Sequence, residues 1–375
     1  MIPYGRHSIN EEDINAVVKV LRSDWLTTGP VVEQFEQALE NTVGAPCVSV
    51  SSGTAALHCA YAAIDLQPGD EVITPPITFI ATQATAAIFG AKIVFADVQP
   101  DTANIDPLAV EAAITRRTKA IVAVDYAGHP ADLYELRKIA DKYKIYLIED
   151  AAHSIGSTCR GEPVGSIADI TTFSFFPTKN ITTGEGGAVA SIQPDLLLKA
   201  RRFSRQGLVR NFDEFVIKTE GPWHQEVQEF GLNYRLPDLL CALGISQLNR
   251  LSEFKSMKSA IFLQYNKFLN NVETIKLPTR RNYTDPNWHL FPIQVPPSKR
   301  REIFNFLRAN GIGVQVNYLP ANRHPVFMNK KVKIDILKKA NNFYESEISL
   351  PLHANLSLNE VEYISQILIK SCAEF

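Results

Sequence analysis

The stretch Phe173-Ser-Phe-Phe-Pro-Thr-Lys-Asn-Ile-Thr-Thr-Gly-Glu-Gly-Gly187 decides the fold of this chain. In it, an apolar, strand-like run leads to one lysine, Lys179, and a glycine-rich turn follows. A lysine just past a buried strand can lie in a poorly hydrated place, where desolvation disfavours its charged form. The neutral amine is a nucleophile toward aldehydes, which is what a Schiff-base lysine requires. Taken alone, Lys179 also fits a surface lysine at an ordinary strand-to-loop junction.

A second run, Ile145-Tyr-Leu-Ile-Glu-Asp150, is short and apolar and ends in two acids. The pattern predicts a buried parallel strand whose carboxyl end presents Asp150. Open α/β sheets bind ligands at the carboxyl ends of their strands, so we expect Asp150 and Lys179 to face one pocket. A carboxylate beside the ring nitrogen of pyridoxal phosphate (PLP) keeps that nitrogen protonated, which makes the cofactor an electron sink. Taken alone, Asp150 also fits a helix N-cap after the strand.

The third element is Ser49-Val-Ser-Ser-Gly-Thr-Ala-Ala-Leu-His-Cys-Ala60, which overlaps the end of a strand-like run. Gly53 permits close approach of the backbone, and Thr54 begins a run of helix formers. The free amides of a helix N-terminus then point at whatever lies in front of them, which predicts a phosphate site. A serine-rich turn also caps helices without any ligand, so this signal is weak by itself.

In this order, the three elements resemble the PLP-dependent enzymes of fold type I, and specifically the DegT/DnrJ-type sugar aminotransferases. The resemblance runs over almost the whole chain. It implies an α/β fold-type I transferase, with a mainly parallel sheet in a large domain and a smaller C-terminal α+β domain. The matching residues are Ser52-Gly-Thr54, Ile148-Glu-Asp-Ala-Ala-His153, Phe173-Ser-Phe175, Thr178-Lys179 and Gly184-Glu-Gly-Gly187.

The resemblance also implies roles around the PLP ring. Lys179 is the catalytic residue, which binds the cofactor covalently and then moves the proton between cofactor and substrate carbon. Asp150 pairs with the ring nitrogen and Phe79 stacks on the ring, although an aromatic residue after a strand is more often part of the core. His153 lies near the phenolic oxygen, in a position where many relatives have glutamine.

The cofactor phosphate is expected to bind at Gly53, Thr54 and Ser174. In the resembled family an asparagine reaches across a dimer interface to the same phosphate, which implies Asn233 of a partner chain. We therefore expect a homodimer with shared active sites. By itself, an asparagine before a helix is an unremarkable cap.

Further matches point, within the family, to the members of pseudaminic acid biosynthesis. They imply a UDP-linked 4-keto-6-deoxy-N-acetylhexosamine as acceptor and an amino acid, glutamate, as donor. Other nucleotide-linked ketosugars and a non-catalytic PLP-binding protein are the alternatives, whereas a PLP-dependent sugar dehydrase would have histidine in place of Lys179. These matches are Ile2-Pro-Tyr-Gly-Arg6, Trp25-Leu-Thr-Thr-Gly-Pro30, Pro76-Ile-Thr-Phe-Ile-Ala-Thr82, Val124-Asp-Tyr-Ala-Gly128 and Leu350-Pro351.

Length and composition are those of an ordinary globular protein. The 375 residues favour one large and one smaller domain, which we place at 1–250 and 251–375. Apolar residues make up 45% and charged residues 21% of the chain, and the net charge is −2. A nucleic-acid partner is not expected, because the densest basic cluster, 299–301, is short and opens a helical pattern.

The cysteines and the apolar runs of the sequence indicate the cellular compartment. Five scattered cysteines show no metal-ligand spacing, so we predict neither a metal site nor a disulfide framework. No signal-peptide pattern opens the chain, and no apolar run approaches the roughly eighteen residues that a membrane span needs. A cytoplasmic protein without a membrane partner is the expectation.

Alternating apolar runs and helical patterns predict βαβ units and a mainly parallel sheet. No GxGxxG follows the first run, so a dinucleotide site of the Rossmann type is not expected. The predicted strands are 47–50, 71–74, 92–96, 120–124, 145–148, 170–175 and 188–191.

Outside this region, Ser8 is the candidate cap of a first helix that ends near Trp25. A polar excursion is expected over 201–229, and Thr27 and Thr28 are candidate sugar-nucleotide contacts that also fit plain turn chemistry. Asn317, Tyr318 and His324 could face the inter-domain cleft or lie in a solvated loop. The remaining predicted elements are helices over 239–251, 298–310 and 358–368 and strands over 288–295 and 313–318.

Overall fold

A seven-stranded sheet lies at the centre of the computed structural model, which describes residues 1–328 and 336–374. The strand order is β1-β9-β8-β5-β4-β2-β3, and only β9 runs against its neighbours. The predicted α/β fold with a mainly parallel sheet is confirmed, and the bounds of each predicted strand of this sheet lie within two residues of the observed ones. The strands are β1 Cys47–Val50, β2 Glu71–Thr74, β3 Lys92–Phe95, β4 Thr118–Val124, β5 Tyr146–Asp150, β8 Ile170–Ser174 and β9 Gly187–Ala190.

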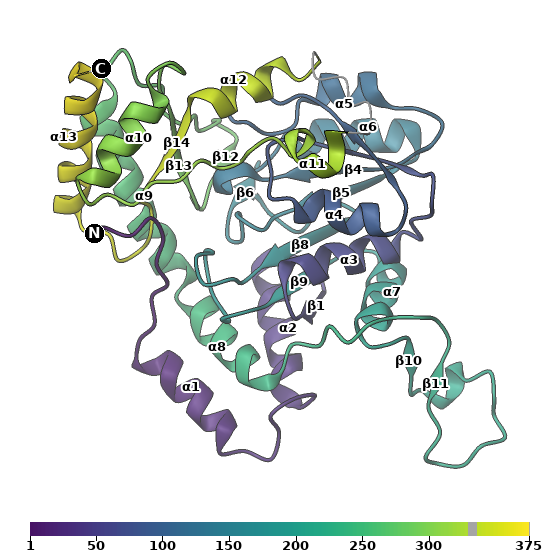
Figure 1. Cartoon of the computed structure of the whole chain (residues 1–375). Helices are drawn as coiled ribbons and strands as arrows, with labels where there is room; N and C mark the ends of the chain where they lie inside the picture. Colours follow the sequence, from purple (N-terminus) through teal and green to yellow (C-terminus); the bar gives the residue numbers. More distant parts are fainter. Residues whose placement is uncertain (329–335, 375) are drawn as a thin grey trace.

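Helices cover the sheet (Figure 1). Strands β1, β2 and β9 are buried along their whole length, which explains why they are apolar runs without alternation. The helices of this part are α1 Glu11–Leu21, α2 Pro30–Val43, α3 Gly53–Ala63, α4 Ala81–Ile88, α5 Pro107–Ala113, α6 Leu133–Tyr143, α7 Pro194–Ser204 and α8 Asp238–Asn249.

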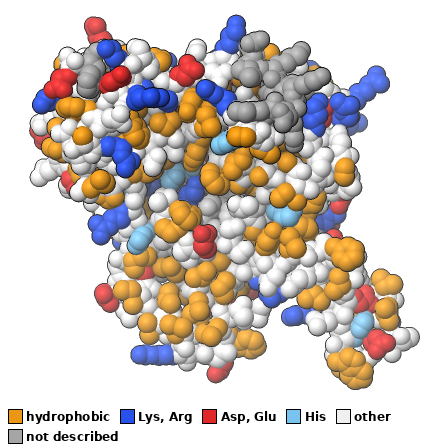
Figure 2. Space-filling view, in the orientation of Figure 1, with side chains coloured by type: hydrophobic (Ala, Val, Ile, Leu, Met, Phe, Trp, Pro, Cys, Tyr) orange, Lys and Arg blue, Asp and Glu red, His pale blue; other side chains and the backbone are white. Residues whose placement is uncertain are grey.

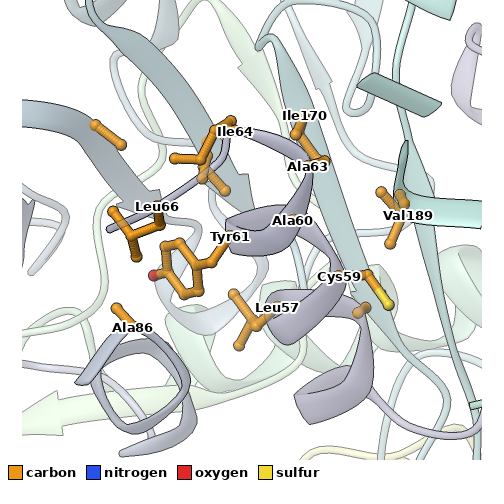
Figure 3. Close-up of a cluster of buried hydrophobic side chains, with 14 of the residues drawn as sticks. Leu57, Cys59, Ala60, Tyr61, Ala63, Ile64, Leu66, Ala86, Ile170 and Val189 are labelled. Carbon is orange, nitrogen blue, oxygen red and sulfur yellow. The ribbon is translucent and has the colours of Figure 1, made fainter. Parts of the chain in front are cut away.

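Helix α3 packs directly on strands β8 and β9, and its alanines allow the close approach. Figure 3 shows its apolar side chains beside Ile170 and Val189 of those strands. Tyr61 is fully buried, and its hydroxyl donates a 2.7 Å hydrogen bond to the Thr82 carbonyl. Burial of one such large side chain contributes about 1.5–3 kcal/mol. This packing fixes the first turn of α3 against the end of β8.

The C-terminal part has its own apolar core around the two-stranded sheet of β13 and β14. The Phe262 and Trp288 rings stack with centroids 4.2 Å apart, and Tyr265 stacks on Phe291. The division at residue 250 stays a prediction; Arg250 lies between α8 and α9. The elements are α9 Leu251–Leu269, β13 Phe291–Gln294, α10 Arg300–Ala309, α11 Pro325–Met328, α12 Lys338–Ser346, β14 Glu347–Leu350 and α13 Leu358–Glu374.

An arm, defined here as residues 205–232, leaves the body after α7 (Figure 1). It carries the short pair β10 Leu208–Val209 and β11 Glu226–Val227. The predicted excursion began too early, because 201–204 belong to α7. Large apolar side chains are exposed on the arm, among them Trp223 and Phe230, and Figure 2 shows hydrophobic groups gathered there.

Three other expectations were wrong. Asn10, not Ser8, caps α1: its side chain accepts from the Asp13 amide while Asp13 accepts from the Asn10 amide. The helix ends at Leu21, before the predicted end at Trp25. The predicted strand over 313–318 is absent, and Gln315 makes only an isolated bridge with Ser349.

A further three-stranded sheet joins the two parts of the chain, because β12 comes from the C-terminal part. Its strands are β6 Thr158–Cys159, β7 Glu162–Pro163 and β12 Thr284–Asp285. Across 1–328 and 336–374, the helices are all too short or too polar to cross a membrane.

Candidate active site

A cleft with about 490 Å³ of free volume opens at the carboxyl edge of the central sheet. Strands β4, β5 and β8 end at this edge. Open α/β sheets bind their ligands at the carboxyl ends of the strands. The volume falls in the range of ~300–1,000 Å³ that is typical of small-molecule sites. Seven predicted site residues line the cleft: Gly53, Thr54, Phe79, Asp150, His153, Ser174 and Lys179.

Lys179 lies on the turn that follows β8. Its amide donates to the Phe176 carbonyl at 2.9 Å, and the next residue, Asn180, donates to the carbonyls of His153 and Asn287. These bonds tie the turn both to the end of β5 and to the C-terminal part. Burial lowers the pKa of Lys179 to about 8, although Asp150 favours the charged amine. The side chain therefore has a far larger neutral fraction near neutral pH than an ordinary lysine.

Asp150 is the last residue of β5 and is nearly fully buried. One carboxylate oxygen accepts from the Thr82 hydroxyl at 2.8 Å, and the other accepts from the Ala152 amide at 3.2 Å. Burial raises the pKa of Asp150, while these two bonds and Lys179 counter that effect. The carboxylate thus lies at the floor of the cleft in a fixed orientation.

His153 is buried and packs against His289, with ring centroids 4.3 Å apart and ring planes tilted by 46°. Its Nε2 lies 3.4 Å from the Tyr318 hydroxyl, whereas Nδ1 has no hydrogen-bond partner among the described residues. Burial, with a smaller effect of Lys179, lowers the pKa of His153 well below its usual value. The neutral ring therefore keeps an unused polar atom inside the site.

The opposite end of the cleft is the first turn of α3. Ser52 caps the helix by accepting from the Ala55 amide at 3.1 Å, and Gly53 and Thr54 line the cleft. A Cβ built on Gly53 would lie 2.7 Å from the Ser174 Cβ, so only glycine allows this approach. A helix N-terminus next to a serine hydroxyl is a good anion site.

The third wall comes from the C-terminal part and the N-terminal segment. The Tyr126 hydroxyl donates to the Asn317 carbonyl at 2.6 Å, and the Asn317 side chain donates to the Tyr4 hydroxyl at 2.5 Å. Phe79 is 58% exposed, with its ring 6.2 Å from that of Tyr318. Phe79 is therefore not part of the core, and a flat ligand has room beside it.

Some of the predicted site residues do not line the cleft. Asn233 is exposed, bridges Arg205 and does not line the cleft of its own chain. Thr27 and Thr28 line a separate groove that is rich in arginine, and His324 lies outside the cleft.

Three residues that shape the cleft were not singled out from the sequence: Tyr4, Thr82 and His289. Tyr4 and Thr82 fall inside stretches that carried the resemblance, which was the only available signal. Across 1–328 and 336–374, no cluster of three or more histidine, cysteine or acidic side chains is arranged to hold a metal ion.

The residues present fit PLP. The cleft offers a buried carboxylate for the ring nitrogen, an amine of lowered pKa for the aldehyde and a helix N-terminus for the phosphate. The unpartnered Nδ1 of His153 adds a free polar atom to the site.

Comparisons with known proteins agree with this geometry. The pattern of the DegT/DnrJ/EryC1/StrS aminotransferase family matches residues 7–369. The chain is 38% identical to the UDP-4-amino-4,6-dideoxy-N-acetyl-beta-L-altrosamine transaminase of Campylobacter jejuni, over 98% of this chain and 96% of that protein.

Solved structures extend the likeness to the fold. Helicobacter pylori PseC, an aminotransferase involved in the biosynthesis of pseudoaminic acid, superimposes with a TM-score of 0.93 at 32% identity, over 100% of both chains. Spr1654 from Streptococcus pneumoniae, solved in a PMP-form, has a TM-score of 0.94 at 30% identity, also over 100% of both chains. The same protein in its PLP-form gives 0.93. The predicted fold-type I arrangement is confirmed.

Proposed function

Because the chain belongs to the DegT/DnrJ/EryC1/StrS aminotransferase family, we propose that it moves an amino group from L-glutamate to C4 of a UDP-linked 4-keto-6-deoxy-N-acetylhexosamine, in pseudaminic acid biosynthesis. It is a PLP-dependent nucleotide-sugar aminotransferase. One observation carries the assignment of the site: the Lys179 amine and the Asp150 carboxylate share one cleft at the carboxyl edge of the sheet.

The predicted site residues that line the cleft each have a role in this proposal. PLP, when bound, withdraws electrons from the substrate carbon that loses its proton and carries the amino group between the two half-reactions. With PLP bound, the neutral Lys179 amine would hold the cofactor through its aldehyde and would serve as the base and acid that moves the proton at the substrate carbon. Its lowered pKa suits both tasks.

Asp150 would hold the ring nitrogen of PLP. Burial disfavours the charge of its carboxylate, and a cationic nitrogen beside it would favour the ionised form. Thr82 and the Ala152 amide orient this carboxylate. Neutral His153 and exposed Phe79 would contact the ring, and the first turn of α3 and Ser174 would hold the phosphate.

The sugar nucleotide is proposed from the relatives. Both the Campylobacter transaminase and the Helicobacter enzyme carry names that point to pseudaminic acid chemistry. The third wall of the cleft supports a polar, ring-shaped acceptor, because Tyr4, Asn317 and Tyr318 bring hydroxyl and amide groups to it. A different nucleotide-linked ketosugar is the alternative within the same chemistry.

We also propose a homodimer in which each chain completes the site of the other. Asn233 is exposed, follows the arm directly in the chain and does not line its own cleft. On the arm, Phe230 is 97% exposed, and large exposed apolar groups mark protein interfaces. A second copy of the chain would cover them and receive Asn233 at its cofactor phosphate.

A cytoplasmic location completes the proposal. All five cysteines are free thiols, four of them buried, which agrees with a reducing compartment.

The function is tested by following the cofactor and the product together. With PLP and glutamate, the absorption band of the lysine-bound cofactor should disappear, and a UDP-linked 4-ketosugar should restore it. A non-catalytic PLP-binding protein would keep the band throughout. Mass spectrometry over a panel of UDP- and dTDP-linked ketosugars then identifies the product; amination of dTDP-sugars alone would contradict the UDP assignment and leave the aminotransfer chemistry standing.

A further inference from the structure

A second cavity lies next to the active-site cleft, and the two share Thr178, Lys179 and His289. It is enclosed by the N-terminal segment, the turn after β8, helices α8 and α9 and the loop after β14. Six basic or histidine side chains line it: Arg6, His7, Lys179, Lys258, His289 and His353. No acidic side chain of the described residues is among its lining groups.

Two of these side chains lack a strong partner. Lys258 on α9 is 5% exposed, and its amine makes no hydrogen bond or ion pair with any described residue. His353 is 6% exposed, and neither ring nitrogen makes a well-formed hydrogen bond within residues 1–328 and 336–374, although the Pro3 carbonyl lies near enough to favour the protonated ring. Buried polar groups are nearly always paired. Neither side chain therefore has a charged acceptor among the described residues.

The pKa shifts of the lining groups are those expected of a cavity without a carboxylate in its lining. Burial lowers the pKa of Lys258 to about 7, with a smaller effect of Lys255, and the pKa values of His289 and His353 also lie below their usual value. Asp150 favours the charged form of Lys179 and Glu360 that of His353, but neither carboxylate lines the cavity. Buried Asp13, which lies near Gln247, is already paired with Arg250.

The volume of the cavity limits the size of the ligand that it can hold. Its free volume is about 30 Å³, and one water needs roughly 10–15 Å³ on this measure. A single ion or one carboxylate group fits, whereas a sugar or a nucleotide does not. Arg6 and His7 are exposed, so a small anion can reach the interior past two more basic groups.

We propose that this cavity binds one small monovalent anion, either a halide ion or a single carboxylate group, at the Lys258 amine and the His353 ring. Such an anion supplies a charged acceptor, which both side chains lack among the described residues. It also favours the protonated form of neighbouring Lys179, so bound anion makes that amine less reactive toward aldehydes. The site therefore couples the salt or carboxylate content of the solution to the attachment of the cofactor.

Thermal unfolding of the purified full-length protein tests the proposal without turnover. Sodium bromide and sodium glutarate are titrated separately, at an ionic strength held constant with a bulky organic sulfonate. An anion that binds only the folded state raises Tm saturably, by roughly 3 °C at a hundred times its Kd for a chain of this size. Lys258→Met should abolish the rise, and His353→Gln should reduce it.

The control is Lys267→Met, which removes an exposed lysine from the same helix, α9. A saturable rise in Tm that is kept in Lys267→Met and lost in Lys258→Met supports the site. A rise with bromide alone identifies a halide site, and a rise with glutarate alone identifies a carboxylate site. Bromide-soaked crystals should then show anomalous density at Lys258 and His353 if the halide binds. A rise that is equal in all variants, no rise with either anion, or a cavity that contains water only overturns the proposal. None of these outcomes affects the proposed transamination, which is measured separately by its product.

Discussion

The hydroxyl of Thr82 donates a 2.8 Å hydrogen bond to Oδ2 of Asp150, across 68 positions of sequence. Thr82 is on the first turn of α4, and its oxygen also lies 2.9 Å from the Thr78 hydroxyl. Because Oδ1 of Asp150 accepts from the Ala152 amide, both carboxylate oxygens are fixed by neighbours. The orientation of the carboxylate that we propose as the partner of the ring nitrogen thus depends on α4 as well as on β5.

We expect Thr82→Val to lower kcat by roughly tenfold, because a hydrogen bond to a charged group contributes about 1.5–3 kcal/mol and part of that is recovered by other contacts. KM for the sugar nucleotide should change little. Steady-state kinetics at saturating PLP measure both. Thr85→Val is the matched control, since Thr85 is buried on the same helix and bonds only the Ala81 carbonyl. Equal losses in the two variants would show that Thr82 acts through packing alone.

Asp150→Asn should reduce turnover by at least about a hundredfold while the protein remains folded. The amide keeps an acceptor for the Thr82 hydroxyl but supplies no negative charge, and loss of an electrostatic partner in an active site typically costs a factor of this order. Product formation and circular dichroism are the measurements. Near-normal turnover would rule out Asp150 as the partner of the ring nitrogen.

Much of this site was predictable because its parts lie at the ends of sequence patterns. A strand that is buried on both faces reads as an apolar run, so the positions of Asp150 and of the turn around Lys179 followed from the sequence. The glycine-containing start of α3 was visible for the same reason. The strand boundaries of the sheet were accurate because most strands end at or directly before a polar residue; β3, which ends at Phe95 before Ala96, is the exception.

Other features depend on contacts between distant segments, which local patterns do not contain. The first helix has two possible polar caps, and the choice of Asn10 over Ser8 is settled by its reciprocal bond with Asp13. Residues 313–318 resemble a strand, yet only Gln315 makes a ladder-type pair, with Ser349. On either side of it, Gly313 donates to the Ile2 carbonyl and the Asn317 amide donates to the Glu347 side chain. The bond from Thr82 to Asp150 is of the same long-range kind.

The rate at which the cofactor-free protein captures PLP should rise with pH, with a midpoint near pH 8. The reactive form is the neutral amine, and the pKa of Lys179 is lowered from its usual value to about 8, so the neutral fraction grows as pH increases through 8. Stopped-flow absorbance at a series of pH values gives the midpoint. Asp150 favours the charged amine, so Asp150→Asn should move the midpoint to lower pH. A midpoint near the ordinary lysine value of about 10.4 would contradict the desolvated environment.

Two inactive variants should restore activity to each other if Asn233 completes the site of the partner chain. Lys179→Ala removes the amine of one chain, and Asn233→Ala removes an exposed side chain that its own cleft does not use. In a mixed dimer, the chain with intact Lys179 receives an intact Asn233 from its partner, whereas the second site lacks both. Random mixing makes half of the dimers mixed with one working site each, so about a quarter of wild-type amination should return.

The control for this experiment mixes Lys179→Ala with Asp150→Asn. Both residues line the cleft of one chain, so every site in the mixture lacks one of them and no activity should return. Affinity tags of two kinds confirm that mixed dimers have formed. Recovery in the Asn233 mixture alone supports the shared site. Absence of recovery in demonstrated mixed dimers would mean that each chain builds its phosphate site alone, with Gly53, Thr54 and Ser174 as its protein contacts.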